Sequence, residues 1–225
     1  MNVAVLIPNR PDGGRRDALL AWTVNRLRTL HPGFQIAVGQ HGADEGAFNR
    51  SAALNRAAAQ ASDADVFVLA DGDSFVGASQ LEQAIATATS CRQVTFAFDR
   101  YCYLSRQMSD QIMAGFVGDW TPGVEFTMQG TCSSMVVVPA ALWWEIGGAD
   151  EGFVGWGGED VALSLALQTF GSGLQRVHGD VWHLWHPPAP HVADDLWPGR
   201  VDRYAAAAYD KGRMRALLHQ LRAER

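Results

Sequence analysis

The sequence predicts an α/β protein in which a mixed, mainly parallel sheet is flanked by helices. Short apolar runs at residues 3–8, 34–38 and 65–70 have the length and composition of strands. Between them, residues 17–30 and 48–61 carry apolar or alanine positions at helical spacing. This alternation of strand and helix is typical of a Rossmann-like parallel sheet.

The second half of the chain continues with elements of less regular spacing. We expect further helices over residues 78–90, 140–146, 159–170 and 200–222. We expect further strands over residues 134–138 and 177–184, and a strand or hairpin over 93–104. Glycines and a proline interrupt residues 107–130, which are assigned no element. Because no linker composition breaks the chain, we expect one domain over residues 1–198, with a C-terminal helix within 199–225 packed on it.

The composition is that of a folded protein without a polyanionic partner. Hydrophobic residues make up 48% and charged residues 19% of the 225-residue chain, which argues against extensive disorder. The formal net charge of −6 offers no attraction to a nucleic acid polymer or an anionic bilayer. No stretch approaches the roughly 18 consecutive apolar residues that a membrane span requires. We therefore expect a cytoplasmic protein with no membrane span.

The cysteine content agrees with a reducing compartment. Cys91, Cys102 and Cys132 are odd in number and form no CxxC pair. Neither a disulfide framework nor a zinc knuckle is therefore expected. We expect each cysteine to be a small buried apolar residue.

Two carboxylates directly follow the third predicted strand, in the sequence Asp71-Gly72-Asp73. In an open parallel sheet, ligands bind beyond the carboxyl ends of the strands. Paired carboxylates at that edge can hold a divalent cation against a diphosphate. A solvated turn is the alternative interpretation, since Asp and Gly also favour turns.

Two histidines, His183 and His186, lie at the end of the last predicted strand. Mn²⁺ accepts carboxylate and imidazole ligands together, so one or both histidines could complete a site with Asp73. Structural histidines bonded to the backbone are the alternative. The two prolines that follow at 187 and 188 stiffen the chain and favour ligation, without deciding between the two histidines.

The most specific signal is a glycine-rich segment that leads into a predicted helix. Residues 147–158 contain six glycines, with Trp156 among them and Glu159 and Asp160 directly after. Glycines permit unusual backbone angles and close approach to a ligand. The alternative is that these two acidic residues only stabilise the start of the helix, where the helix dipole favours negative charge. A tryptophan beside them, however, suits the face of a sugar, and a carboxylate there could deprotonate a hydroxyl.

Three segments, in this order, resemble the inverting β-1,4-galactosyltransferases and the related chondroitin-synthase-type transferases, which have the GT-A fold. They read Phe-Asn-Arg-Ser-Ala-Ala-Leu-Asn at 48–55, Gly-Trp-Gly-Gly-Glu-Asp at 155–160 and Val-Trp-His-Leu-Trp-His-Pro at 181–187. The resemblance covers residues 1–188 in order and spacing. Three ordered motifs are more specific than any one of them.

The resemblance implies roles for particular residues. The expected catalytic base is Asp160, with Glu159 beside it. The expected metal ligands are Asp73, His186 and, three residues earlier, His183, and the expected metal is Mn²⁺ with Mg²⁺ as the alternative. Acceptor contacts are expected from Trp156, Gly157 and Gly158. Donor contacts are expected from Pro8, Asn9, Arg10, Phe48, Arg50, Asp71, Gly72 and Gly130.

The chain also departs from the family pattern. The basic residues that follow the first strand are displaced to Arg15 and Arg16 by residues 11–14. The stalk, membrane anchor and disulfides of the animal enzymes are not present in the sequence, which suggests a soluble bacterial or phage form.

The sequence therefore predicts an inverting, metal-dependent glycosyltransferase. It would move a hexose or N-acetylhexosamine, with a galactose type favoured, from a UDP-sugar to a hydroxyl of an unidentified acceptor. Arg50 and the metal are expected to offset the charge on the leaving diphosphate. One alternative is a sugar-phosphate nucleotidyltransferase. Such proteins usually have a glycine-rich phosphate loop after the first strand, and here only Gly13-Gly14 corresponds to it. The other alternative is a non-catalytic sugar- or nucleotide-binding protein of the same fold.

Overall fold

A six-stranded mixed sheet forms the centre of the protein. The computed structural model describes residues 1–155, 157–188 and 197–224 of the chain. The strand order in this sheet is β2-β1-β3-β8-β5-β9. Its members are β1 (Val3–Asn9), β2 (Gln35–Gln40), β3 (Val66–Leu69), β5 (Val94–Phe96), β8 (Val136–Pro139) and β9 (Leu174–Arg176). Only β8 runs antiparallel to its neighbours in this sheet, so the prediction of a mixed, mainly parallel sheet is confirmed.

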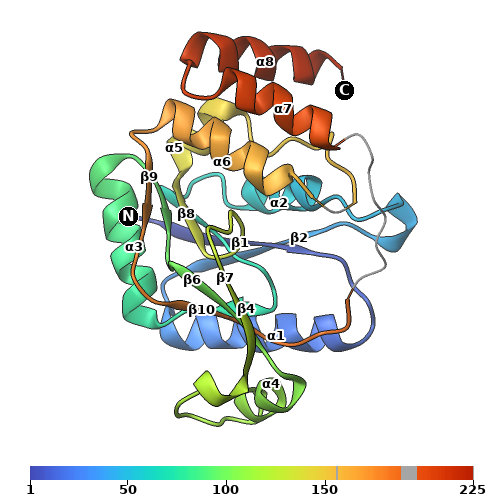
Figure 1. The fold of residues 1–225 in the computed structure, drawn as a ribbon, viewed down its shortest axis with the longest axis vertical. Helices are drawn as coiled ribbons and strands as arrows, with labels where there is room; N and C mark the ends of the chain where they lie inside the picture. Colours follow the sequence, from blue (N-terminus) through green and yellow to red (C-terminus); the bar gives the residue numbers. More distant parts are fainter. Residues whose placement is uncertain (156, 189–196, 225) are drawn as a thin grey trace.

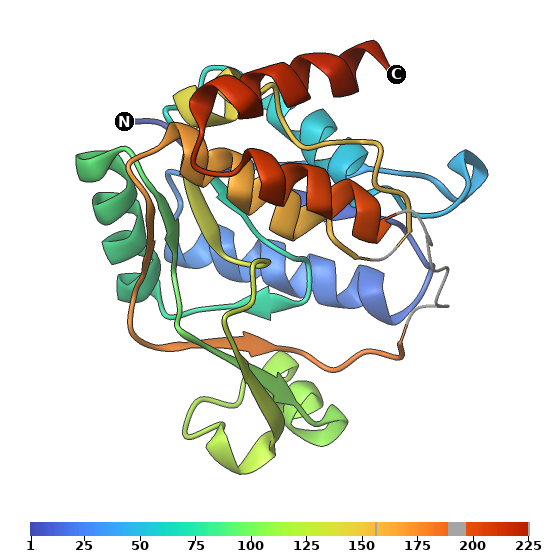
Figure 2. The same ribbon diagram turned by 45° about the horizontal axis from the view of Figure 1, so that its top comes forward.

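Helices cover both faces of this sheet, as predicted. They are α1 (Arg15–Leu30), α2 (Arg50–Gln60), α3 (Ala78–Cys91), α5 (Ala140–Ile146) and α6 (Glu159–Phe170). Figures 1 and 2 show α1 on one side of β1, and α2, α5 and α6 on the other. Gly39 permits the closest approach, because a Cβ at this position would lie 1.7 Å from the Ala53 carbonyl oxygen. The bare backbone of β2 therefore lets α2 pack directly on the sheet.

A smaller second sheet was not expected from the sequence. Its strand order is β4-β10-β6-β7, and its members are β4 (Ser74–Phe75), β10 (Asp180–His183), β6 (Arg100–Leu104) and β7 (Val124–Gln129). The short helix α4 (Arg106–Met113) joins β6 to a 3₁₀ turn (Thr121–Gly123) that precedes β7, and a second 3₁₀ turn (Ala43–Glu45) follows β2. The prediction of one strand or hairpin over 93–104 is wrong, because β5 and β6 belong to different sheets.

The C-terminal segment forms two helices, so the prediction of a single helix over 200–222 is wrong. They are α7 (Trp197–Ala207) and α8 (Lys211–Ala223). The chain reverses at Tyr209, whose φ is +63°, and Asp210 then caps α8 by accepting from the backbone N–H of Gly212 and Arg213 at 2.9 and 3.0 Å. An aspartate with this capping geometry starts a new helix. Both helices pack against α6 at the top of Figure 1.

The expectation of three buried cysteines is wrong for two of them. Cys102 is buried, whereas Cys91 is exposed and Cys132 is half-buried. Cys91 is the last residue of α3. Among the described helices, none combines the length and the apolar character needed to cross a bilayer.

One buried carboxylate joins α7 to the rest of the fold. The Asp150 side chain is only 6% exposed. It accepts from Arg200 Nε and Nη2 at 2.7 and 2.8 Å, and from the Tyr204 hydroxyl at 3.0 Å. Two-point pairing of this kind fixes both position and orientation.

We expect Asp150→Ala to lower the free energy of unfolding by about 2–4 kcal/mol, because it leaves a partly buried guanidinium without its carboxylate. The matched control is Asp202→Ala, which removes an exposed aspartate of α7 and should change stability by less than about 0.5 kcal/mol. Urea denaturation of both variants measures the difference. Equal stabilities would show that this ion pair does not hold the helices in place.

Candidate active site

The carboxyl ends of strands from both sheets converge on one segment, Asp71-Gly72-Asp73. This segment follows β3 and leads directly into β4. β4 pairs antiparallel with β10, with Ser74 opposite His183. The Leu184 backbone N–H also donates to the Asp73 carbonyl oxygen at 2.8 Å. This register brings the end of β10 next to Asp73.

Asp73, His183 and His186 form a compact cluster at this junction. His186 Nε2 lies 3.1 Å from Asp73 Oδ2, and His183 Nε2 lies 3.7 Å from Asp73 Oδ1. One ligand atom from each of the three residues lies within 4.8 Å of the others. Ligands held about 2.1 Å from a common cation would have separations of this size. The geometry therefore suits a single divalent ion.

The protonation of the cluster also fits a cation. His186 Nδ1 lies 2.8 Å from the Pro187 carbonyl oxygen, so donation along this bond would free the Nε2 lone pair for an ion bound at the cluster. Burial lowers the pKa of His183, although the Asp73 charge opposes this, which favours a neutral imidazole. Burial alone would raise the pKa of Asp73, but His183 and His186 hold it well below its usual value. One carboxylate and two imidazoles are a ligand set that Mn²⁺ accepts.

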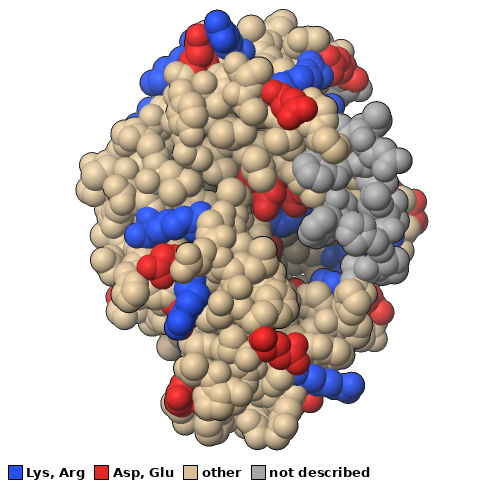
Figure 3. Space-filling model, in the orientation of Figure 1, with Lys and Arg blue, Asp and Glu red and all other residues tan. Residues whose placement is uncertain are grey.

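A cavity of about 430 Å³ opens in front of this cluster, within the size range of small-molecule sites. Asp73 is part of its wall, and so are five residues predicted to contact the donor: Pro8, Asn9, Arg10, Phe48 and Gly72. Arg15, Arg16 and the two prolines at 187 and 188 complete the side nearest α1. Figure 3 shows a hollow near the centre of the visible face, where acidic and basic side chains meet.

Asp71 has a different partner from Asp73. Arg50, the first residue of α2, donates to Asp71 Oδ1 from Nη2 at 2.7 Å and from Nε at 3.3 Å. Burial alone would lower the pKa of Arg50, but Asp71, Glu159 and Asp160 together raise it above its usual value. Arg50 therefore links the loop after β3 to the start of α6.

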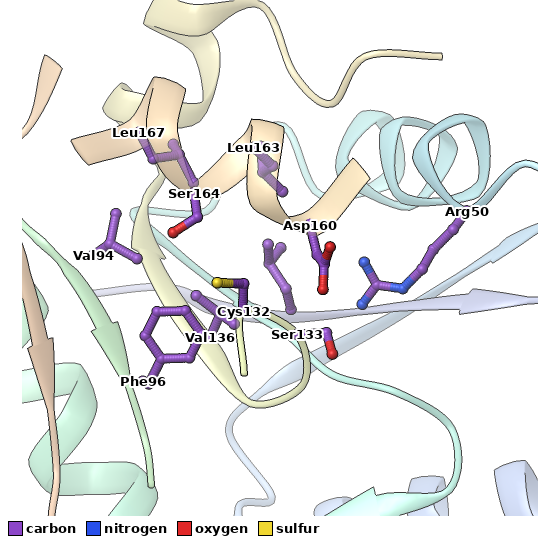
Figure 4. A pocket seen from close by; sticks show the side chains of 11 residues that line it. Arg50, Val94, Phe96, Cys132, Ser133, Val136, Asp160, Leu163, Ser164 and Leu167 are labelled. Atoms are coloured by element: carbon purple, nitrogen blue, oxygen red, sulfur yellow. The ribbon is translucent and has the colours of Figure 1, made fainter. Parts of the chain in front are cut away.

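Glu159 and Asp160 open α6 on the other side of Arg50. Figure 4 shows the side chains of Asp160 and Arg50 directed toward the same space, with Ser133 and Cys132 on the loop opposite. The enclosed part of this space is a cavity of about 10 Å³. Asp160 Oδ1 accepts the Val161 N–H at 2.8 Å. Burial raises the pKa of Glu159, and Asp160 adds to this while Arg50 opposes it.

Two asparagines hold the glycine-rich segment 147–158 against α2. Asn55 donates to the Ala149 carbonyl oxygen at 2.9 Å and to Glu151 Oε1 at 2.7 Å, and its own oxygen accepts the Ala149 N–H at 2.9 Å. Asn49 donates to the Glu151 carbonyl oxygen at 2.7 Å. Both asparagines belong to the motif at residues 48–55, but the motif alone does not predict their hydrogen bonds to a segment about a hundred residues away.

The remaining predicted residues have different outcomes. Gly157 and Gly158 have φ values of +115° and +83°, angles that favour glycine, directly before Glu159. Gly130 lies elsewhere, in a hollow lined with Arg100, Arg176 and Asp180 and not among the residues of the 430 Å³ cavity. Trp156 lies outside the described residues.

Aromatic side chains of the small sheet lie beside His183. The Tyr103 ring lies 4.7 Å from that of His183 and stacks on Phe126 at 4.1 Å. The spacing of aromatic or apolar side chains at every second residue along β6 and β7 could have predicted that they share one face of a sheet. The pairing of β6 with β10, which brings this face to His183, could not be foreseen without the second sheet.

Comparison with known proteins places this geometry in context. No model of a known protein family matches the chain. A stretch of 56 residues, 25% of this chain, is 43% identical to the validoxylamine A glucosyltransferases of Streptomyces hygroscopicus subsp. jinggangensis (strain 5008) and subsp. limoneus. This stretch is 12% of each of those proteins.

Solved structures extend the likeness to the fold. The catalytic domain of Drosophila β1,4-galactosyltransferase 7, in complex with xylobiose, superposes with a TM-score of 0.50 at 16% identity over 78% of this chain and 64% of that chain. S. aureus TarS superposes with a TM-score of 0.57 at 12% identity over 100% of this chain and 42% of that chain. The chain thus spans less than two thirds of each relative. These neighbours are GT-A glycosyltransferases, and the predicted GT-A fold is confirmed.

We expect Asn55→Ala to loosen the glycine-rich segment, because it removes three hydrogen bonds across two elements. Hydrogen exchange of the Ala149 amide should accelerate, and the free energy of unfolding should fall by about 1–3 kcal/mol. Asn25→Ala, at an exposed position of α1, is the matched control and should leave that amide unchanged. Equal exchange in both variants would mean that Asn55 does not hold the segment.

Proposed function

We propose that this protein is an inverting, metal-dependent glycosyltransferase. It transfers a hexose or N-acetylhexosamine, with a galactose type favoured, from a UDP-sugar to an acceptor hydroxyl. The observation that carries this proposal is the nucleotide-sized cavity walled by Asp73 of the Asp73–His183–His186 cluster, with Arg50 linking that region to Asp160. The Drosophila neighbour is a galactosyltransferase and the Streptomyces relatives are glucosyltransferases, which supports a hexose.

The cavity suits the nucleotide part of the donor. Pro8, Asn9 and Arg10 lie at the carboxyl end of β1, the usual position for a ligand in an open α/β sheet. Phe48 adds an aromatic ring to the cavity wall. The donor role of Gly130 has less support, because it lies in another hollow.

Asp73, His183 and His186 would hold the metal. Their mixed oxygen and nitrogen donors favour Mn²⁺ over Mg²⁺, which prefers oxygen ligands. Once bound, the cation supplies positive charge against the leaving diphosphate. The prolines that follow His186 and the Nδ1 bond of His186 keep its ring in place.

Asp160 is the proposed general base. It lies at the N-terminus of α6, and its second oxygen is left for an acceptor hydroxyl once Oδ1 has accepted the Val161 N–H. Deprotonation of that hydroxyl lets it attack the anomeric carbon from the face opposite the diphosphate, which inverts the configuration. Glu159, Gly157 and Gly158 shape the acceptor side, together with Trp156 as proposed from the sequence.

The proposal is tested first by UDP release from a panel of UDP-sugars, where water can replace the unidentified acceptor. We expect release with one sugar in the presence of Mn²⁺, loss with EDTA and recovery when Mn²⁺ is restored. Unchanged release after thorough chelation would rule out the metal. Pyrophosphate release from a nucleoside triphosphate and a sugar phosphate would instead identify a nucleotidyltransferase.

We expect Asp160→Asn to lower kcat by about 10²–10⁴-fold, because an amide cannot accept the proton. Binding of UDP, measured by calorimetry, should stay within about two-fold of the unaltered protein, since the cavity does not include Asp160. Asp202→Asn, a remote exposed control, should retain full turnover. Turnover near that of the unaltered protein would remove Asp160 from the base role.

A further inference from the structure

The arginines around the donor cavity differ in how their charge is already used. Arg10 Nη1 donates to the Gly46 carbonyl oxygen at 2.6 Å. Arg15 pairs with the Asp110 carboxylate. Arg50 pairs with Asp71. Among the ion pairs of the described residues, the one that joins an arginine to Asp73 belongs to Arg16, whose Nη1 lies 3.9 Å from Asp73 Oδ2.

Arg50, which the sequence analysis assigned to the diphosphate, is poorly placed for that role. Its side chain is 13% exposed, and it makes two hydrogen bonds to Asp71. Glu159 and Asp160 act on the same guanidinium. Three half-buried carboxylates thus share one cation, and drawing it toward a diphosphate would leave them without a partner. The charge of Arg50 is therefore already balanced by carboxylates of the protein.

Arg16 is in the opposite situation. It stands in the first turn of α1, lines the 430 Å³ cavity and keeps 34% of its side chain exposed. Its Nη2 makes one long contact, 3.5 Å, to the Pro187 carbonyl oxygen. Arg16 also acts on the exposed Asp12 carboxylate, which lines the same cavity. Among the hydrogen bonds of the described residues, however, none joins the Arg16 guanidinium to a carboxylate, so it can still turn to an anion in the cavity.

We propose that Arg16 is the residue that recognises the diphosphate of the donor, so that this cavity selects nucleoside diphosphates over monophosphates and nucleosides. The assignment rests on the proposed function. The diphosphate diester of a nucleotide-sugar carries two negative charges and gains a third as the nucleoside diphosphate leaves. Because Asp73 already offsets one charge of a bound divalent cation, a further cation is needed beside the metal. A guanidinium offers paired N–H donors that match phosphate oxygens.

The position of Arg16 gives the assignment a second consequence. Without a nucleotide, its positive charge lies next to the carboxylate that would bind the metal, and it opposes a cation there. Removing the charge should therefore tighten the binding of Mn²⁺ alone while it weakens the binding of UDP. A role limited to packing would not produce opposite effects on these two ligands.

The experiment compares the unaltered protein with Arg16→Ala, Arg16→Lys and Arg28→Ala, the last an exposed arginine at the far end of the same helix. Calorimetry measures the affinities for UDP, UMP and uridine with saturating Mn²⁺, and electron paramagnetic resonance measures Mn²⁺ binding without nucleotide. For Arg16→Ala we expect UDP to bind about ten-fold or more weakly, uridine to bind unchanged, and Mn²⁺ alone to bind as tightly or more tightly. The UDP affinity of Arg16→Lys should lie between those of Arg16→Ala and the unaltered protein. Arg28→Ala should bind all these ligands as the unaltered protein does.

The outcomes separate this assignment from the proposed function. UDP binding by the unaltered protein with unchanged affinity in Arg16→Ala would overturn the assignment of Arg16 alone. Equal losses for UDP and uridine, or weaker Mn²⁺ binding, would also overturn it by indicating a structural role. Failure of the unaltered protein to bind UDP with Mn²⁺ would overturn both the assignment and the proposed donor.

Discussion

The site depends on the pairing between a strand of two residues, β4, and the last strand, β10. Asp73 belongs to the large sheet's connection after β3, whereas His183 ends β10 of the small sheet and His186 follows it in the chain. The His183–Ser74 register and the Leu184 N–H bond to the Asp73 carbonyl oxygen join these parts. A shift of this register by one residue would turn the His183 side chain to the opposite face of the sheet. The cluster therefore exists only because this short ladder has one register.

Electrostatics then separates the two aspartates of the same motif. Asp71 is bonded to Arg50, which also faces Glu159 and Asp160. Asp73 instead faces two imidazoles and the more exposed charge of Arg16. Since buried charges need partners, this division leaves Asp73 available for a cation and ties Asp71 to the framework. Two carboxylates separated by one glycine thus have different roles because different elements supply their neighbours.

Much of the large sheet could be predicted because its signals are local. The apolar runs of β1 and β3 are bounded by Pro8 and Asp71, and α6 begins and ends at the predicted residues, Glu159 and Phe170. The small sheet could not be predicted, since β4 is too short to carry a pattern and β7 is mostly exposed. The boundary between the two C-terminal helices could not be predicted either, because it depends on the left-handed backbone conformation of Tyr209.

For the site, motif order identified the cluster members but not their partners. Asp73, His183 and His186 were named from the ends of predicted strands, and the structure brings them together. The pairing of Arg50 with Asp71 and the bonds from Asn55 to the glycine-rich segment depend on contacts between residues 21 or more positions apart. Such contacts carry no periodic signal in a single sequence.

The most direct test of this account is the position of the metal ion in a crystal grown with Mn²⁺ and UDP. Anomalous diffraction near the manganese absorption edge locates the ion independently of any assumed chemistry. The account predicts one peak within about 2.5 Å of an Asp73 carboxylate oxygen and of the Nε2 atoms of His183 and His186. A peak on Asp71 or between Glu159 and Asp160, with none at the cluster, would contradict it.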